Sequence, residues 1–157
     1  MAAAPVIETP RLLLREFDPS DAAGFYAMNA DAEVLRYTGD EPFADLAAAE
    51  AFIRSYDHYR RYGCGRWTVL RKADQSYLGF CGLKYDPDLD ETDLGFRLPR
   101  EYWGQGYATE AARACVEYGF TELGLATIVG RARRDNLASI RVLEKVGFAY
   151  WKDFAFD

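Results

Sequence analysis

The most informative stretch of the sequence is Tyr102-Trp103-Gly104-Gln105-Gly106-Tyr107-Ala108-Thr109-Glu110-Ala111. Its two glycines lie between a predicted strand and a predicted helix. The first turn of a helix leaves four N–H groups unpaired at the positive end of the helix dipole, which makes an anion site. Glycine lets the backbone take a positive φ and approach a phosphate closely. The stretch therefore predicts either a phosphate-binding turn or a tight strand-to-helix turn without a ligand.

Two better-known phosphate loops are excluded. The pattern G-x-x-x-x-G-K-[ST] does not occur in this stretch, and Thr109 stands where a dinucleotide-binding motif has its third glycine.

The spacing of apolar residues around this stretch predicts the remaining elements. We expect strands at about 11–17, 67–71, 77–83, 92–98, 127–133 and 148–154, and helices at about 18–29, 45–62, 107–123 and 137–146. Asp45 is the expected cap of the second helix, and Gly63 its expected stop. The short connections make the strands from 67 to 98 antiparallel. The order β-α-α-β-β-β-α-β-α-β predicts an α/β fold with a mixed sheet.

Length and composition set limits on the class of protein. With 157 residues, we expect a single domain spanning 1–157. Half of the residues are apolar, which argues against disorder. We expect no membrane association, since no apolar run reaches the roughly 20 residues of a membrane span. The first residues lack a basic region followed by an apolar one, so we expect a cytoplasmic protein.

The charge indicates what the partners are. A net charge of −6 argues against nucleic acid, because phosphate binding relies on Lys and Arg. Residues 1–95 hold 10 basic and 17 acidic side chains, so this part favours a cationic ligand. No metal site is expected: the three cysteines form no C-x-x-C pair, and His58 is the single histidine. We expect three reduced thiols.

Three motifs, in order, resemble the GNAT N-acetyltransferases. They are 8–15 (ETPRLLLR), 97–111 (RLPREYWGQGYATEA), and 136–139 (NLAS) followed by 142–148 (VLEKVGF). They are most similar to the branch that acetylates the N-termini of ribosomal proteins (RimJ/RimL-like). The resemblance implies a GNAT fold, whose mostly antiparallel sheet splays to hold coenzyme A. It also implies acetyl-CoA as the donor and a primary amine as the acceptor, either a protein N-terminus or a small molecule, with direct attack in a ternary complex. The alternatives are another acyl-CoA donor, or a CoA-binding sensor without turnover.

The resemblance also assigns binding residues. The backbones of the strand before the turn would pair with the pantetheine arm, the N–H groups of the turn would hold the pyrophosphate, and an asparagine would bind the arm from the other side. In this chain these residues are Phe96, Arg97 and Leu98; Gly104, Gln105, Gly106, Tyr107, Ala108 and Thr109; and Asn136.

Two catalytic candidates follow from the same resemblance. Asp93 stands where members of the family often carry a glutamate and would take the proton of the amine through a water; otherwise it is a strand-edge carboxylate. Ser139 would hydrogen-bond or protonate the departing thiolate; otherwise it only satisfies helix backbone. Leu143 occupies the position of the family's tyrosine acid, and Glu101 replaces a residue that contacts phosphate in many members.

The acceptor pocket and the end of the chain give two further expectations. The first two helices and their loop should line the pocket, with Tyr37, Phe43, and Trp67 or Tyr85. Only residues 155–157 follow the last predicted strand, whereas the family has one more strand. The strand is then absent, or a neighbouring chain supplies its pairing in a homodimer, or the sheet is shorter than predicted.

Overall fold

The computed structural model describes residues 3–154. Its strands are β1 (Ile7–Glu8), β2 (Leu12–Arg15), β3 (Arg66–Arg71), β4 (Tyr77–Asp86), β5 (Glu91–Arg97) and β6 (Val129–Gly130). Its α-helices are α1 (Ala22–Met28), α2 (Ala32–Leu35), α3 (Leu46–Ser55), α4 (His58–Tyr62), α5 (Tyr107–Thr121) and α6 (Leu137–Val146), with 3-10 turns η1 (Pro19–Asp21) and η2 (Arg100–Tyr102).

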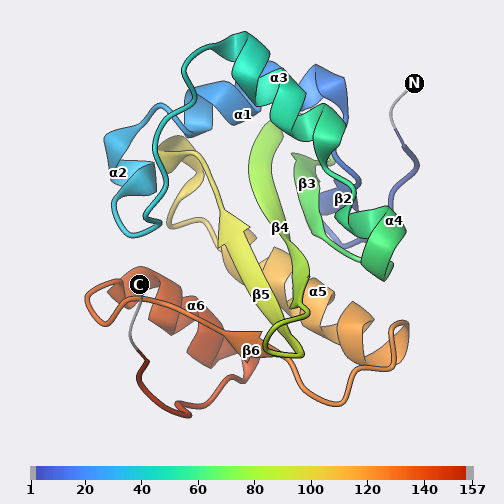
Figure 1. The fold of residues 1–157 in the computed structure, drawn as a ribbon, viewed down its shortest axis with the longest axis vertical. Helices are drawn as coiled ribbons and strands as arrows, with labels where there is room; N and C mark the ends of the chain where they lie inside the picture. The colour runs from blue at the N-terminus through green and yellow to red at the C-terminus, as the bar shows by residue number, and fades with distance from the viewer. Residues whose placement is uncertain (1–2, 155–157) are drawn as a thin grey trace.

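The six strands form one mixed sheet in the order β1-β2-β3-β4-β5-β6 (Figure 1). Neighbouring strands from β1 to β5 are antiparallel, and β5 pairs with β6 in parallel. This confirms the predicted mixed sheet and its antiparallel centre.

Helices pack on both faces of the sheet. On one face, α5 lies against β4 and β5, where Cys115 and Ala112 are fully buried in a core with Trp67. On the other face, α1 and α3 pack together around Phe25 and Ile53 in a second core. No helix among residues 3–154 is long and apolar enough to cross a membrane.

Small residues let α5 lie close to the sheet. Its buried positions include Ala111, Ala112 and Gly119, which share one face of the helix. A Cβ at Gly119 would lie 2.7 Å from the side chain of Ile128 and 3.0 Å from that of Leu83. This close approach fixes the direction of α5, and with it the position of the Gly104–Gly106 turn at its start.

The second predicted helix is two helices, so the prediction of a continuous helix at 45–62 was wrong. The chain turns out of helical geometry at Tyr56, with ψ of 105°, and resumes in α4. The break is stabilised because the Tyr56 hydroxyl accepts a hydrogen bond from the Arg66 N–H. Both predicted ends are confirmed: Asp45 accepts a hydrogen bond from the Ala48 N–H, and Gly63 closes α4 with φ of 75°.

Other differences occur where strand pairing decides the outcome. The predicted strand 127–133 is only the two residues of β6, and residues 148–154 form no strand, contrary to prediction. A strand needs a partner for its backbone groups, and Tyr150 and Trp151 are instead 78% and 66% exposed. Residues 155–157 lie outside the described residues. At the other end of the sheet, β1 was not predicted; it pairs with β2, where Ile7 faces Leu14.

All three cysteines are buried free thiols, as predicted. The sulfur atoms of Cys81 and Cys115 lie 3.7 Å apart, far beyond the roughly 2.05 Å of a disulfide. Burial holds the pKa of the Cys115 thiol well above its ordinary value.

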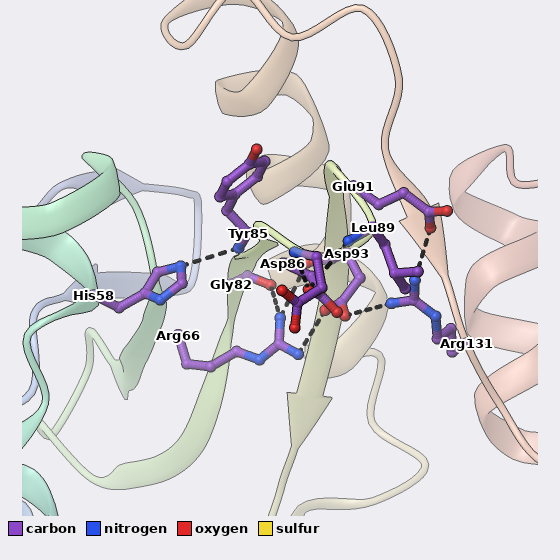
Figure 2. A network of polar contacts seen from close by, with 10 residues as sticks. His58, Arg66, Gly82, Tyr85, Asp86, Leu89, Glu91, Asp93 and Arg131 are labelled. Carbon is purple, nitrogen blue, oxygen red and sulfur yellow. Dashed lines mark hydrogen bonds and ion pairs between the residues drawn. The ribbon is translucent and has the colours of Figure 1, made fainter. Parts of the chain in front are cut away.

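His58 connects α4 to β4. Its Nε2 atom accepts a hydrogen bond of 3.0 Å from the Tyr85 N–H, so the imidazole is neutral and carries its proton on Nδ1 (Figure 2). Burial, and then the charges of Lys84 and Arg66, lower the pKa of His58 below its ordinary value.

We expect this histidine to make the fold sensitive to mild acid. The pKa of His58 is lower in the folded than in the unfolded chain, so the stabilisation is complete above pH 6.5 and is lost as the pH falls through the folded-state pKa. The His58→Gln variant keeps an acceptor for Tyr85 but does not titrate. Between pH 7 and 5, urea titrations should therefore show a larger fall in the free energy of unfolding for the wild type. Equal falls in both proteins would contradict this assignment.

Candidate active site

A fork in the sheet opens the site. β5 pairs with β6 only where Asp93 faces Val129 and Leu94 faces Gly130, and the two strands then separate (Figure 1). The edge of β5 beyond this point therefore has no strand partner on its β6 side. A cavity of about 910 Å³ lies there, and Gly95, Phe96, Arg97 and Leu98 line it. The predicted splay of the sheet is present.

The glycine turn forms a second wall of the cavity. Gly104 and Gly106 have φ values of 74° and 82°, and Gly106 is the N-cap of α5. In the part of the chain that is described, no hydrogen bond is donated by the main-chain N–H groups of residues 104–109. Six consecutive free donors at a helix N-terminus fit a polyphosphate group.

A side-chain clamp fixes this turn to the sheet. Arg11 Nε lies 2.7 Å from a carboxylate oxygen of Glu110, and the Arg11 guanidinium also donates to the Gln105 carbonyl at 3.1 Å. The same guanidinium lies 4.4 Å from the ring centroid of Tyr107, and Thr9 donates to Glu110 at 2.6 Å. The first sequence motif therefore binds the second one directly, and both glycines are held in place.

The start of α6 forms the opposite wall. Asn136 and Ser139 both line the cavity, and Asn136 Oδ1 accepts a hydrogen bond of 3.3 Å from the Ser139 N–H. Among residues 3–154, neither Asn136 Nδ2 nor Ser139 Oγ takes part in a hydrogen bond. Leu143 is only 8% exposed and packs under Gly130. Leu143, which occupies the position where the resemblance implies a tyrosine acid, is thus part of the core.

Asp93 lies at the vertex of the fork between two guanidinium groups (Figure 2). Its Oδ1 is 2.7 Å from Arg66 and its Oδ2 is 2.8 Å from Arg131, which also binds Glu91 at 2.7 Å. Arg66 further donates to the main-chain carbonyls of Gly82 and Asp93. The network ties β3, β4 and β5 to the segment that follows β6.

Most of the predicted site residues meet in the one cavity. Those that line it are Phe96, Arg97, Leu98, Gly104, Gly106, Tyr107, Ala108, Thr109, Asn136 and Ser139. Two do not. Asp93 lies beside the lining residue Arg66, and the Gln105 side chain is turned to the Glu101 carbonyl at 2.9 Å.

The acceptor side was predicted only in part. Tyr37 and Phe43 line the cavity as expected. Trp67 is instead a core residue that is 1% exposed, and the Tyr85 hydroxyl donates to Asp90.

Arg66 is a lining residue that sequence reasoning missed. Its guanidinium lies across β4 and β5, where Gly82 and Gly95 face each other. A Cβ at Gly95 would lie 2.5 Å from this guanidinium. Two glycines opposite each other in predicted neighbouring strands were the available signal that a long side chain passes over them.

Comparison with known proteins identifies the family. The Acetyltransferase (GNAT) domain matches residues 11–149. The FsC-acetyl coenzyme A-N(2)-transacetylase of Aspergillus fumigatus is 45% identical over an alignment of length 162, which covers 97% of this chain and 68% of that protein. The uncharacterized N-acetyltransferase YoaA of Bacillus subtilis is 32% identical over 146 residues, 92% of this chain and 82% of that one.

Solved structures agree. A GNAT-family acetyltransferase from Bacillus anthracis has a TM-score of 0.78 at 26% identity and covers 90% of this chain and 81% of that one. A ribosomal L7/L12 α-N-protein acetyltransferase solved with coenzyme A has a TM-score of 0.79, covering 92% and 84%; at 16% identity it shows the fold alone. The chain belongs to the GNAT acetyltransferase family and is an N-acetyltransferase that uses acetyl-CoA.

Proposed function

We propose that this enzyme moves the acetyl group of acetyl-CoA to a primary amine, of a protein N-terminus or a small molecule, by direct attack while both substrates are bound. One observation carries the proposal: the open edge of β5, the free N–H groups of the glycine turn and the start of α6 line a single cavity. The amine then reaches the thioester from the far side of that cavity.

The backbone would do most of the binding. The N–H groups of residues 104–109 would hold the pyrophosphate, where Gln105 contributes only its main chain. The backbones of Phe96, Arg97 and Leu98 would pair with the pantetheine arm, and Asn136 Nδ2 would donate to it from α6. An N–H on β5 would polarise the thioester carbonyl, as a preorganised oxyanion donor does.

The proton of the amine must leave before attack, since an amine with a pKa near 10 is mostly ammonium at neutral pH. Asp93 is the proposed base. Its carboxylate lies 2.7 Å from Arg66, which lines the cavity, so a water between Asp93 and the amine would carry the proton.

Ser139 is the proposed acid for the departing thiolate. It lines the cavity in the first turn of α6, its hydroxyl forms no hydrogen bond with residues 3–154, and Leu143 excludes the tyrosine alternative. A hydroxyl in this position supplies a proton or a hydrogen bond when sulfur leaves.

The relatives differ in what they acetylate. The spermidine N(1)-acetyltransferase of Escherichia coli is 25% identical, while RimL-type neighbours are named for ribosomal proteins.

We propose a cytoplasmic, RimJ/RimL-like enzyme of one domain. The sheet has β6 at one edge, and a homodimer would form on that edge.

The glycine turn gives the first test. Alanine is disfavoured at φ of 74°, so Gly104→Ala should displace the N–H donors; losing one charge-assisted hydrogen bond of about 1.5–3 kcal/mol weakens acetyl-CoA binding at least about 10-fold. Gly124→Ala is the matched control. Its φ is 66°, it too has open space around the new methyl group, and it does not line the cavity. Calorimetric titration should show weaker binding for the first variant alone; equal binding would mean that the turn is only structural.

Ser139→Ala tests the proposed acid, and with it turnover itself. With an amine panel and acetyl-CoA, we expect kcat to fall about 10²-fold or more while the KM for acetyl-CoA stays constant. A change below about 3-fold would remove Ser139 from the chemistry. If the wild type binds acetyl-CoA but transfers to no amine, the chain is a sensor rather than a catalyst.

The Asp93→Asn variant tests whether Asp93 acts as the base or only holds Arg66 and Arg131 in place. Glu91→Gln is the matched control, because it removes a carboxylate from the same arginine. A base should contribute about 10²–10⁴-fold to kcat/KM, so Asp93→Asn should lose at least that factor while Glu91→Gln loses far less. If both variants lose activity equally, Asp93 only positions Arg66 and Arg131.

A further inference from the structure

Six aromatic rings that pack against one another line the cavity. We call them the aromatic wall: Phe17, Phe25, Phe43, Phe52, Tyr56 and Phe80. Centroids of neighbouring rings lie between 4.8 Å (Phe17 to Tyr56) and 6.4 Å (Phe17 to Phe80) apart. The rings come from β4, α1, α3 and the loops around them, so the wall is a continuous surface built from separate parts of the chain.

The wall begins beside the reacting end of the cavity. Phe80 on β4 faces Arg97 on β5 in the sheet register, and the Arg97 guanidinium lies 5.2 Å from the Phe80 ring centroid. Arg97 in turn lies between Phe96 and Leu98, which also line the cavity. An amine whose nitrogen reaches the edge of β5 therefore places the rest of its molecule against the wall.

The charged side chains that line the cavity beside the aromatic wall do not suit a molecule with several ammonium groups. The lining carboxylates are Glu33, Asp40 and Glu41, against the cations Arg36, Arg66, Lys84 and Arg97. Asp40 lies 2.8 Å from Arg97, and Glu33 lies 3.9 Å from Arg36. Carboxylates are therefore outnumbered, and two of the three already have a cationic partner.

We propose that the acceptor is a primary amine on an aromatic or similarly flat apolar body with no second positive charge. Aromatic surfaces recognise such a body by apolar burial and ring packing. A second cation against Phe80 would meet Arg97, which already occupies that ring. The inference rests on the proposed function and narrows its acceptor. An arylalkylamine and a peptide with an aromatic first residue share this chemistry.

The test measures kcat/KM of the full chain with acetyl-CoA and defined amines: phenethylamine, n-butylamine and spermidine. Pocket contacts of this size discriminate by roughly 10-fold or more, so phenethylamine should exceed both others by at least that factor. Two tripeptide amides, beginning with phenylalanine or with alanine, separate the sources. If the tripeptide that begins with phenylalanine has a higher kcat/KM than phenethylamine, the acceptor is a peptide N-terminus. If phenethylamine has the higher kcat/KM, the acceptor is a small amine.

Phe52→Ala links the preference to the wall. Phe52 is 44% exposed, and Phe120→Ala on α5 is the matched control because Phe120 is 46% exposed and does not line the cavity. We expect Phe52→Ala to raise the KM for phenethylamine about 10-fold, to change that for n-butylamine less, and to spare the KM for acetyl-CoA. Phe120→Ala should change none of them.

Failure of this inference can be distinguished from failure of the proposed function. If spermidine or n-butylamine equals phenethylamine, or if Phe52→Ala affects all amines alike, the inference is overturned while acetyl transfer stands. If acetyl-CoA binds but no amine of the panel is acetylated, the inference is likewise overturned. If acetyl-CoA does not bind, the proposed function fails first.

Discussion

The site depends on the separation of β6 from β5 after two paired residues. Backbone groups inside a protein need hydrogen-bond partners, so a strand edge that opens into a cavity is costly unless a ligand or water pairs with it. Here that edge meets a second set of unpaired donors at the start of α5. Both sets line the same cavity, so the main chain itself becomes the binding surface. The side chains then decide which amine is brought to it.

Two polar assemblies hold this arrangement in place. At the vertex, the carboxylates of Asp93 and Glu91 on β5 bind Arg131 just after β6, which fixes where the strands separate. At the start of α5, Arg11 and Glu110 fix the glycine turn against the first strands. Each assembly joins residues far apart in the sequence, so each acts only once the sheet has formed. The site is therefore preorganised by the fold rather than by local turns alone.

Local sequence patterns predicted the elements whose ends are set by capping residues. α6 has the predicted bounds because Asn136 caps it and Gly147 ends it. The lengths of β6 and of the last predicted strand were wrong because apolar alternation does not reveal whether a partner strand exists. Of the aromatic wall, only Phe43 was predicted to line the pocket: Phe52 and Tyr56 follow helical spacing, which predicts core, whereas in the structure both line the cavity.

Backbone amide hydrogen exchange, measured with and without saturating acetyl-CoA, reports directly which main-chain N–H groups hold the donor. We expect acetyl-CoA to slow exchange at residues 104–109 and at the open edge of β5, while the exposed N–H groups in the loop between β4 and β5 exchange as before. Binding of acetyl-CoA without added protection at residues 104–109 would show that the main chain of the glycine turn does not hold the donor.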